Sequence, residues 1–149
     1  MKILLDIDGV MVPAASWKAP KLQDDGFPSF SDKAVLSLNK ILAKTNATLV
    51  LTTSHKSRYS LARWKRIFAV RGINANILQI QNSEKYLSRK DEVLNWLNSH
   101  PDEKNFVIID DDKSLNDLPP AFKDSLVLTS PLLGLNEPIA DKAIEILSK

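Results

Sequence analysis

Five short apolar runs alternate with longer segments of helical periodicity along the chain. The runs lie at residues 3–5, 47–51, 75–80, 106–109 and 126–128. Apolar residues at the spacing of one buried helix face predict helices at residues 31–44, 58–70, from 88 to before 101, and 137–147. Strands that alternate with helices in this way form a parallel sheet with helices on both faces. The sequence therefore predicts an α/β fold: a three-layer α/β/α Rossmann-like domain with about five parallel strands.

Local signals mark several helix ends. Ser31 and Ser88 are expected to cap the first and third helices with their hydroxyls, and Asp91 brings the latter close to a capping box. Arg71 and Gly72 are expected to close the second helix. Pro138 suits the first turn of the last helix, where a missing N–H costs nothing.

Composition narrows the class of protein. Of the 149 residues, 44% are hydrophobic and 26% are charged, as expected of one globular domain spanning residues 1–149. The absence of cysteine excludes disulfides, thiolate metal sites and a cysteine nucleophile. The net charge of +2 gives no global reason to expect nucleic acid or a membrane as a partner. With no long apolar stretch and no sign of an obligate protein partner, we expect a cytoplasmic protein.

Residues 11–30 have no clear periodicity and contain three prolines. Proline fixes φ and removes a backbone donor, so this stretch is predicted to be a loop or small flap near the active site. Trp17, inside it, is a candidate for lining the substrate entrance. Neither this loop nor the single helix between the third and fourth apolar runs leaves room for a large cap domain.

Polar residues follow three of the five apolar runs. Asp6 and Asp8 follow the first, a Thr-Thr-Ser sequence at 52–54 follows the second, and three aspartates at 110–112 follow the fourth. Because ligands bind beyond the carboxyl ends of parallel strands, we expect these clusters to form one site. Taken singly, each has a plain alternative as a turn or helix cap, and Asp112 is expected to be such a cap.

The chemistry that this set favours is metal-assisted phosphoryl transfer. Side chains two residues apart on an extended chain point the same way, so Asp6 and Asp8 could face one cation. Mg²⁺ prefers hard oxygen ligands, and Asp6 with either Asp110 or Asp111 could hold it. An aspartate can form an aspartyl-phosphate, with Asp8 placed to protonate the leaving oxygen and later activate water.

Four segments, in this order, resemble the motifs of haloacid dehalogenase-like (HAD) phosphohydrolases: LLDIDGV, LVLTTSHK, LSRKDEVLNWL and FVIIDDD. The resemblance implies that Asp6 is the nucleophile and that Asp8 is the acid/base, whose backbone carbonyl also binds the metal. It implies that Asp110 and Asp111 supply the remaining metal ligation, with the direct ligand left open between them. Gly9, the exit from the first motif into the loop, is a candidate substrate-binding residue.

The second and third motifs imply a hydroxyl and a cation for the phosphoryl group. The hydroxyl is assigned to Thr53, with Ser54 as the alternative. The cation is assigned to Arg89, four residues before the first large apolar residue of its helix, in preference to Lys90. Ser54 and Lys90 remain candidates for substrate binding. A cation in the first turn of a helix opposes the helix dipole, which favours an anionic partner nearby.

Residues 126–147, LVLTSPLLGLNEPIADKAIEIL, are similar to the tail of HAD domains associated with RNA-repair proteins. That group commonly has Ser-Trp-Arg after the second strand, where this chain has Ser-His-Lys at 54–56. We expect His55 to be an isolated surface histidine, with substrate binding as the alternative. The basic residues nearby are expected to form a solvated helix face, or else to attract a polyanion: Lys56, Arg58, Arg63, Lys65 and Arg66.

The expected function is that of a Mg²⁺-dependent phosphomonoesterase acting through an aspartyl-phosphate. The resemblance to capless members implies a large phosphorylated substrate, such as a nucleic-acid end, a phosphoprotein or a lipid-linked phosphate. One alternative is a non-catalytic phosphate-binding domain. Another is a receiver-like signalling domain, which carries its phosphoacceptor aspartate at the end of the third strand, where residues 79–82 offer none.

Overall fold

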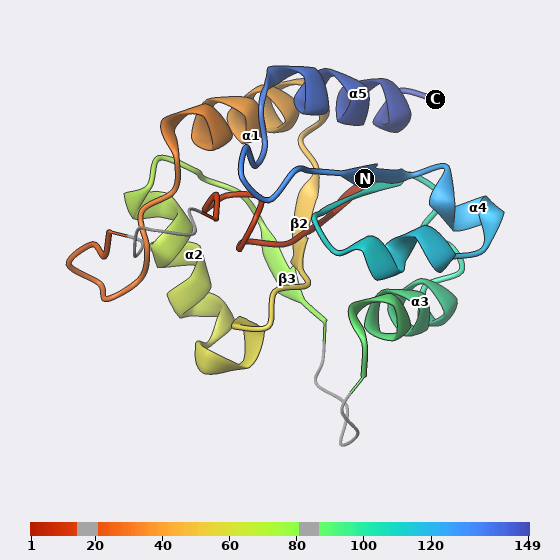
Figure 1. The fold of residues 1–149 in the computed structure, drawn as a ribbon, viewed down its shortest axis with the longest axis horizontal. Helices are drawn as coiled ribbons and strands as arrows, with labels where there is room; N and C mark the ends of the chain where they lie inside the picture. The colour runs from red at the N-terminus through yellow and green to blue at the C-terminus, as the bar shows by residue number, and fades with distance from the viewer. Residues whose placement is uncertain (15–20, 81–86) are drawn as a thin grey trace.

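The computed structural model describes residues 1–14, 21–80 and 87–149, and its centre is a five-stranded, fully parallel sheet (Figure 1). The strand order is β3-β2-β1-β4-β5. The strands are β1 (Lys2–Leu5), β2 (Thr48–Leu51), β3 (Ile77–Gln79), β4 (Phe106–Asp110) and β5 (Leu126–Leu128). The predicted α/β class with about five parallel strands is confirmed, and the described residues include no cap domain.

In the described residues, five α-helices and two 3₁₀ helices flank the sheet. The α-helices are α1 (Asp32–Thr45), α2 (Leu61–Val70), α3 (Arg89–Ser99), α4 (Pro120–Lys123) and α5 (Glu137–Leu147). The 3₁₀ helices are η1 (Lys56–Arg58) and η2 (Lys113–Asp117). The predicted caps are confirmed, because Ser31 Oγ accepts from the N–H of Ala34 and Ser88 Oγ from that of Asp91. The short elements η1, η2 and α4 were not predicted.

The predicted start of the second helix at residue 58 is wrong. The helix begins at Leu61, because Ser60 Oγ caps it by accepting from the N–H of Arg63 at 3.2 Å. Tyr59 has an extended backbone (φ −135°, ψ 150°), which separates η1 from α2. The Tyr59 ring packs edge-on against the buried ring of Trp64, with centroids 5.1 Å apart. This aromatic packing accompanies the break in the helix.

The strand register brings three chain segments to the same level at the carboxyl edge of the sheet. Leu5 of the central strand lies opposite Leu51 on one side and Ile109 on the other. The next residue of β1, Asp6, donates its N–H to the carbonyl of Ile109 at 3.1 Å, and Thr52 donates to that of Leu5 at 3.0 Å. The polar residues that follow the three strands are therefore neighbours.

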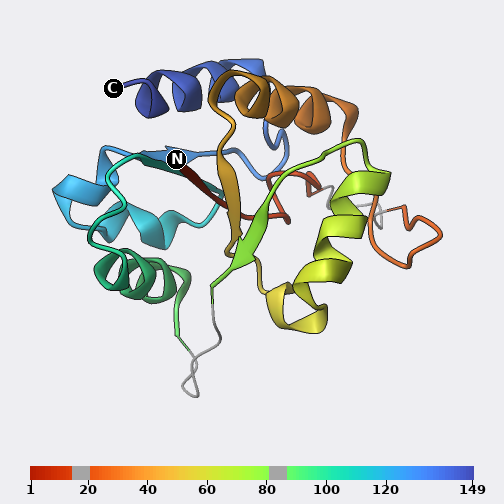
Figure 2. The same cartoon turned by 180° about the vertical axis from the view of Figure 1, so that it is seen from behind.

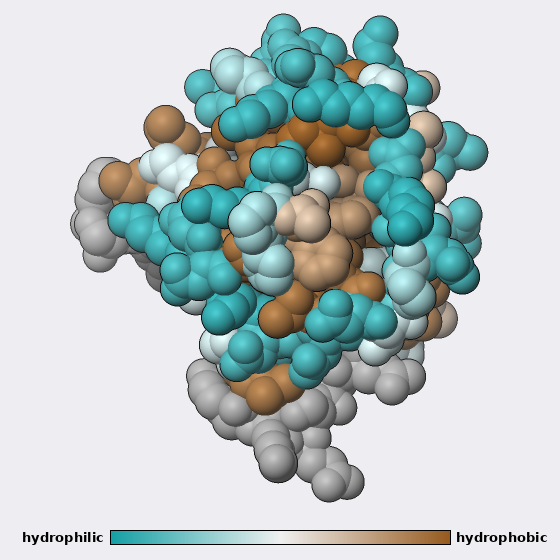
Figure 3. Space-filling model, turned by 90° about the vertical axis from the view of Figure 1, so that its right-hand side faces the viewer, coloured by the Kyte–Doolittle hydropathy of each residue, from teal (hydrophilic) through white to brown (hydrophobic). Residues whose placement is uncertain are grey.

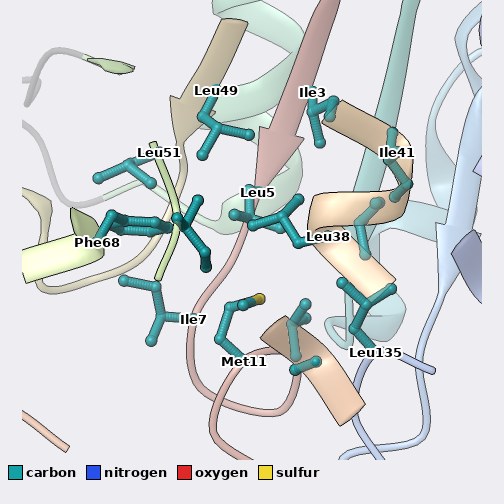
Figure 4. Close-up of a cluster of buried hydrophobic side chains, with 14 of the residues drawn as sticks. Ile3, Leu5, Ile7, Met11, Leu38, Ile41, Leu49, Leu51, Phe68 and Leu135 are labelled. Carbon is teal, nitrogen blue, oxygen red and sulfur yellow. The ribbon is translucent and has the colours of Figure 1, made fainter. Parts of the chain in front are cut away.

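Helices cover both faces of the sheet. Figures 1 and 2 show α1 and α5 along one face and α3 on the opposite face. Side chains alternate along β1, so that Ile3 and Leu5 belong to the core on the α1 side while Leu4 belongs to the core on the α3 side. Figure 4 shows the first of these cores, in which Leu5 and Leu38 approach each other. Each fully buried Leu or Ile stabilises the fold by about 1.5–3 kcal/mol.

The second core is covered less completely. Phe122 of α4 and Leu126 of β5 are only half-buried against it, and the rings of Phe122 and Phe106 lie 6.3 Å apart. The face that carries α4 accordingly has hydrophobic residues near its centre within a hydrophilic surround (Figure 3). None of the described helices combines the length and the hydrophobicity needed to cross a membrane.

The predicted loop at 11–30 is described at residues 11–14 and 21–30, where it forms no helix. A buried arginine of α2's C-terminus, Arg71, holds the second part. Its guanidinium contacts both carboxylate oxygens of Asp25 at 2.7 and 2.9 Å and the carbonyls of Phe27 and Pro28 at 2.9 and 3.1 Å. Trp17 lies outside the described residues, so its predicted place at the substrate entrance stays a prediction.

Candidate active site

Three carboxylates gather at the carboxyl edge of the sheet. Asp6 follows β1, Asp110 ends β4 and Asp111 comes next, and their nearest carboxylate oxygens all lie within 4.8 Å of one another. Asp6 and Asp110 are buried and Asp111 is half-buried. The register of β1 and β4 produces this cluster, because Asp6 and Asp110 follow the paired residues Leu5 and Ile109.

Arg89 joins two of these carboxylates. As the first residue of α3, it places Nη1 at 2.6 Å from Oδ2 of Asp110 and 3.3 Å from Oδ2 of Asp6. Among the residues that the structure describes, Arg89 is the only cation that forms ion pairs with the three carboxylates, and Lys90 forms none with them. Of the two cations considered for the third motif, Arg89 therefore lies at the cluster.

The cluster has a surplus of negative charge, since three carboxylates face one guanidinium. Burial, followed by the charge of Asp110, raises the pKa of Asp6 to about 8, although Arg89 acts in the opposite direction. Burial also raises the pKa of Asp110 against the opposing effect of Arg89. A hard divalent cation would offset this surplus, and carboxylate oxygens are the ligands that Mg²⁺ prefers. The cluster therefore fits a metal ion.

A tight turn follows Asp6. The carbonyl of Ile7 accepts the backbone N–H groups of Val10, Met11 and Val12 at 3.1, 2.8 and 3.0 Å. Gly9, inside the turn, has φ +81°, and a Cβ there would clash with the carboxylate of Asp111. Only glycine can adopt this positive φ without strain and also leave room for the Asp111 carboxylate.

Asp8 lies in the same turn but outside the acidic cluster. Its side chain is 58% exposed, and its Oδ2 lies 2.8 Å from Nε2 of His55. The expectation that the side chains of Asp6 and Asp8 face one cation is not met, because the extended geometry ends at Leu5. The implied ligation through the backbone carbonyl of Asp8 stays a prediction.

The hydroxyls after β2 differ in their surroundings. Thr53 is fully buried, and its Oγ1 accepts from the N–H of His55 at 3.3 Å, whereas Ser54 is exposed. Thr52, which was not assigned a role, donates from Oγ1 to Oδ2 of Asp110 at 3.3 Å. Asp112 caps η2 as expected, because its Oδ1 accepts from the N–H of Ser114 at 2.9 Å.

Besides Thr52, two residues at the site were missed from the sequence. His55 is not the isolated surface histidine that was expected, because it contacts Asp8 and also Arg58, whose Nη1 lies 3.1 Å from its Nδ1. Thr129 donates from Oγ1 to the carbonyl of Gly9 at 2.8 Å. The sequence did carry a signal for Thr129, because it lies in residues 126–147, the segment that is similar to the tail of the RNA-repair group.

The basic segment after β2 divides into two parts. Lys56 is buried and pairs with Glu92 of α3 at 2.7 Å, so the expectation of a solvated side chain fails for it. The other cations of the segment are exposed, as expected: Arg58, Arg63, Lys65 and Arg66.

Comparison with known families matches residues 2–140 to the family described as the HAD domain in Swiss Army Knife RNA repair proteins. The chain belongs to this HAD family. The assignment confirms both the resemblance to HAD phosphohydrolases and the narrower similarity to the RNA-repair group. HAD proteins are generally phosphatases or other hydrolases, so a function of the phosphohydrolase type follows for this member. Searches of curated proteins and of solved structures found no significant match.

Proposed function

We propose that this HAD domain is a Mg²⁺-dependent phosphomonoesterase that acts through an aspartyl-phosphate on Asp6. The observation that carries the proposal is the position of Asp6, whose Oδ2 lies 3.3 Å from the guanidinium of Arg89 and which shares an acidic cluster with Asp110 and Asp111. A carboxylate can attack an anionic phosphate only where positive charge offsets their repulsion. Arg89 supplies one such charge. Mg²⁺, held by Asp6, Asp110, Asp111 and the Asp8 carbonyl, would supply the rest of the charge neutralisation when bound.

In the first step, a carboxylate oxygen of Asp6 forms a bond to phosphorus while the ester P–O bond breaks. The departing oxygen takes the proton of Asp8, which leaves Asp8 as a carboxylate. In the second step, Asp8 removes a proton from water, whose oxygen attacks the phosphorus. The bond to Asp6 breaks, inorganic phosphate leaves, and both aspartates return to their starting states.

The groups proposed to hold the phosphoryl oxygens are polar atoms at the edge of β2 and in the Gly9 turn. Because Thr53 Oγ1 accepts from His55, its own proton can be donated to a phosphoryl oxygen. Ser54, exposed beside it, is the alternative donor, and Lys90 is a second cation that a larger substrate could reach. Gly9 lets the backbone come close to the substrate, since it carries no side chain.

The proposed substrate is a phosphorylated nucleic-acid end. Three features support it: membership of a family found in RNA-repair proteins, the exposure of Asp8 at the site, and the exposed cations that follow the second motif. Such cations attract a polyanion at low salt and lose that attraction as salt rises. A receiver-like function has less support, because β3 is an edge strand and ends in Gln79.

The test compares phenyl phosphate with oligoribonucleotides that carry a 5′- or a 3′-phosphate, each with Mg²⁺ and with chelator. We expect metal-dependent hydrolysis of both classes and a loss on the order of 10³-fold or more in Asp6→Asn. Arg63→Gln should lower kcat/KM for the oligonucleotide by roughly three- to ten-fold and spare phenyl phosphate. Lys142→Gln, an exposed change on α5, is the charge-matched control and should alter neither.

Each contrary outcome removes a separate part of the proposal. Turnover that persists in Asp6→Asn overturns the nucleophile. Hydrolysis of phenyl phosphate without hydrolysis of either oligonucleotide overturns the substrate class alone. Binding of inorganic phosphate without turnover of any substrate favours a non-catalytic phosphate-binding domain.

A further inference from the structure

The carboxylate of Asp8 is held by a side chain to which the four motifs give no role. We propose that His55 is a positioning residue for Asp8, and that Arg58 selects the histidine tautomer that makes this possible. The inference rests on the proposed function, because Asp8 is there the acid/base. It adds a residue pair, His55 and Arg58, on which proton transfer depends.

The two contacts of the imidazole determine where its proton lies. Arg58 Nη1 lies 3.1 Å from Nδ1 of His55, and a guanidinium can only donate hydrogen bonds. Nδ1 must therefore accept, so the ring proton is on Nε2. Nε2 lies 2.8 Å from Oδ2 of Asp8 and donates to it. The chain of donors runs from Arg58 through a neutral His55 to Asp8.

The imidazole is itself well anchored. Its backbone N–H donates to Oγ1 of the buried Thr53, and its ring packs edge-on against Phe27, with centroids 5.7 Å apart and planes at 86°. Phe27 is buried, and its ring packs against that of Trp64 at 5.4 Å. The core thus fixes His55, whose side chain is 27% exposed, at the edge of the site.

Asp8, in contrast, has little to hold it. Within the described part of the chain, the bond from His55 is the only side-chain hydrogen bond that its carboxylate makes. An exposed aspartate without that bond would sample several rotamers, and a general acid works only within hydrogen-bond reach of the oxygen it protonates. The bond occupies Oδ2 and leaves Oδ1 free to carry the transferable proton.

The test uses the full chain with Mg²⁺ and two substrates that differ in how much they need a general acid. 4-Nitrophenyl phosphate releases a stable anion, whereas phenyl phosphate releases a more basic oxygen that benefits more from protonation. We expect His55→Ala to lower kcat/KM for phenyl phosphate by about 10- to 100-fold and for 4-nitrophenyl phosphate by less than about three-fold. KM for phenyl phosphate should change little, whereas a slower second step should lower kcat and KM for 4-nitrophenyl phosphate together.

Two conservative variants carry the test further. The amide of His55→Gln can donate from near the position of Nε2, so this variant should recover phenyl phosphate activity to within about three-fold of the parent. Arg58→Gln, which keeps a donor but removes the charge, should produce a smaller loss than His55→Ala with the same preference for 4-nitrophenyl phosphate. Thermal melting of each variant with Mg²⁺ verifies folding, and if His55→Ala does not fold, the two conservative variants decide the outcome.

A double-mutant cycle separates positioning from a general structural effect. In an Asp8→Asn background, His55→Ala should cause no further loss, because the group that it positions has already lost its function. An equal loss with both substrates, or a full additional loss in Asp8→Asn, would overturn the proposal. If Asp6→Asn abolishes turnover while His55→Ala leaves the dependence on leaving group unchanged, the positioning role fails and the proposed phosphatase stands. If Asp6→Asn retains turnover, the proposed function fails first.

Discussion

Thr129 donates a hydrogen bond from its side chain to the backbone carbonyl of Gly9 at 2.8 Å, across 120 positions of the chain. Close by, the N–H of Leu135 donates to the carbonyl of Val10 at 2.8 Å. Gly134 allows this approach, because a Cβ at that position would lie 2.6 Å from the same carbonyl. The segment after β5 therefore holds the turn that carries Asp8.

Removing the Thr129 hydroxyl should loosen this turn. Thr129→Val leaves the buried carbonyl of Gly9 without its partner, and an unpaired buried group costs about 1–3 kcal/mol. We expect urea unfolding to show a loss of this size, together with a lower kcat. Thr129→Ser keeps the hydroxyl and should lose less than half as much. No loss in Thr129→Val together with a loss in Thr129→Ser would mean that the methyl group, and not the hydrogen bond, matters.

Gly9 and Gly26 form a natural pair for testing the close approach to Asp111. Their φ angles are +81° and +80°, but a Cβ at Gly26 meets nothing within 4 Å, whereas one at Gly9 meets the Asp111 carboxylate. Both alanine variants should lose about 1–2 kcal/mol from the left-handed backbone. Gly9→Ala alone should also raise the Mg²⁺ concentration for half-maximal activity, by roughly ten-fold or more. A similar rise in Gly26→Ala would show that the effect comes from backbone strain.

Arg89 should stabilise the metal-free protein more than the metal-loaded one. In Arg89→Met the buried carboxylates of Asp6 and Asp110 lose their guanidinium, and breaking a buried ion pair costs about 3–5 kcal/mol. We expect denaturant unfolding in chelator to show this loss and Mg²⁺ to recover part of it. Lys90→Met, one residue along α3, should change the free energy of unfolding by less than about 0.5 kcal/mol. The reverse ranking would identify Lys90 as the cation of the cluster.

The contact of Arg71 with Asp25 should give the fold a measurable acid sensitivity. The hydrogen bond from Arg71 lowers the pKa of Asp25 from its ordinary value of 3.8 to about 2. Because the folded state favours the carboxylate, this contribution to stability is complete above about pH 4 and disappears as the pH falls toward 2. Asp25→Asn should therefore be less stable than the parent at neutral pH, by a difference that shrinks over this range.

Circular dichroism followed through denaturant titrations at several pH values measures that difference. Asp24→Asn, at an exposed neighbouring position, is the matched control and should behave like the parent protein. If the difference in stability between Asp25→Asn and the parent stays constant down to pH 2, the ionised carboxylate of Asp25 does not stabilise the fold through Arg71.

The elements that carry the site could be predicted because their signals are local. Apolar periodicity ends where β1 and β2 end, and Ser31 and Ser88 bond to backbone groups three residues away. Parallel topology then brings the strand ends together without any further information. These facts place Asp6 and the aspartates at the end of β4 at the same edge of the sheet.

What could not be predicted depends on contacts between distant segments. The bond between His55 and Asp8 spans 47 positions and that between Thr129 and Gly9 spans 120, and neither leaves a periodic trace in the sequence. The order of the strands likewise depends on pairing between segments that are far apart in the chain, such as β1 with β4. The start of α2 was misplaced because a helical pattern does not show that Tyr59 turns out of the helix to pack on Trp64.

The central claim, that Asp6 carries the phosphoryl group, is tested most directly by trapping the intermediate. Asp8→Asn removes the base for the second step, while 4-nitrophenyl phosphate needs little acid in the first, so the intermediate should accumulate. Acid quenching with Mg²⁺ present, followed by peptide mapping, should find phosphate on Asp6 in Asp8→Asn and none in Asp6→Asn. The central claim would be contradicted if the parent protein turns over the substrate but Asp8→Asn carries no phosphate on Asp6. Phosphate found on another residue would contradict it as well.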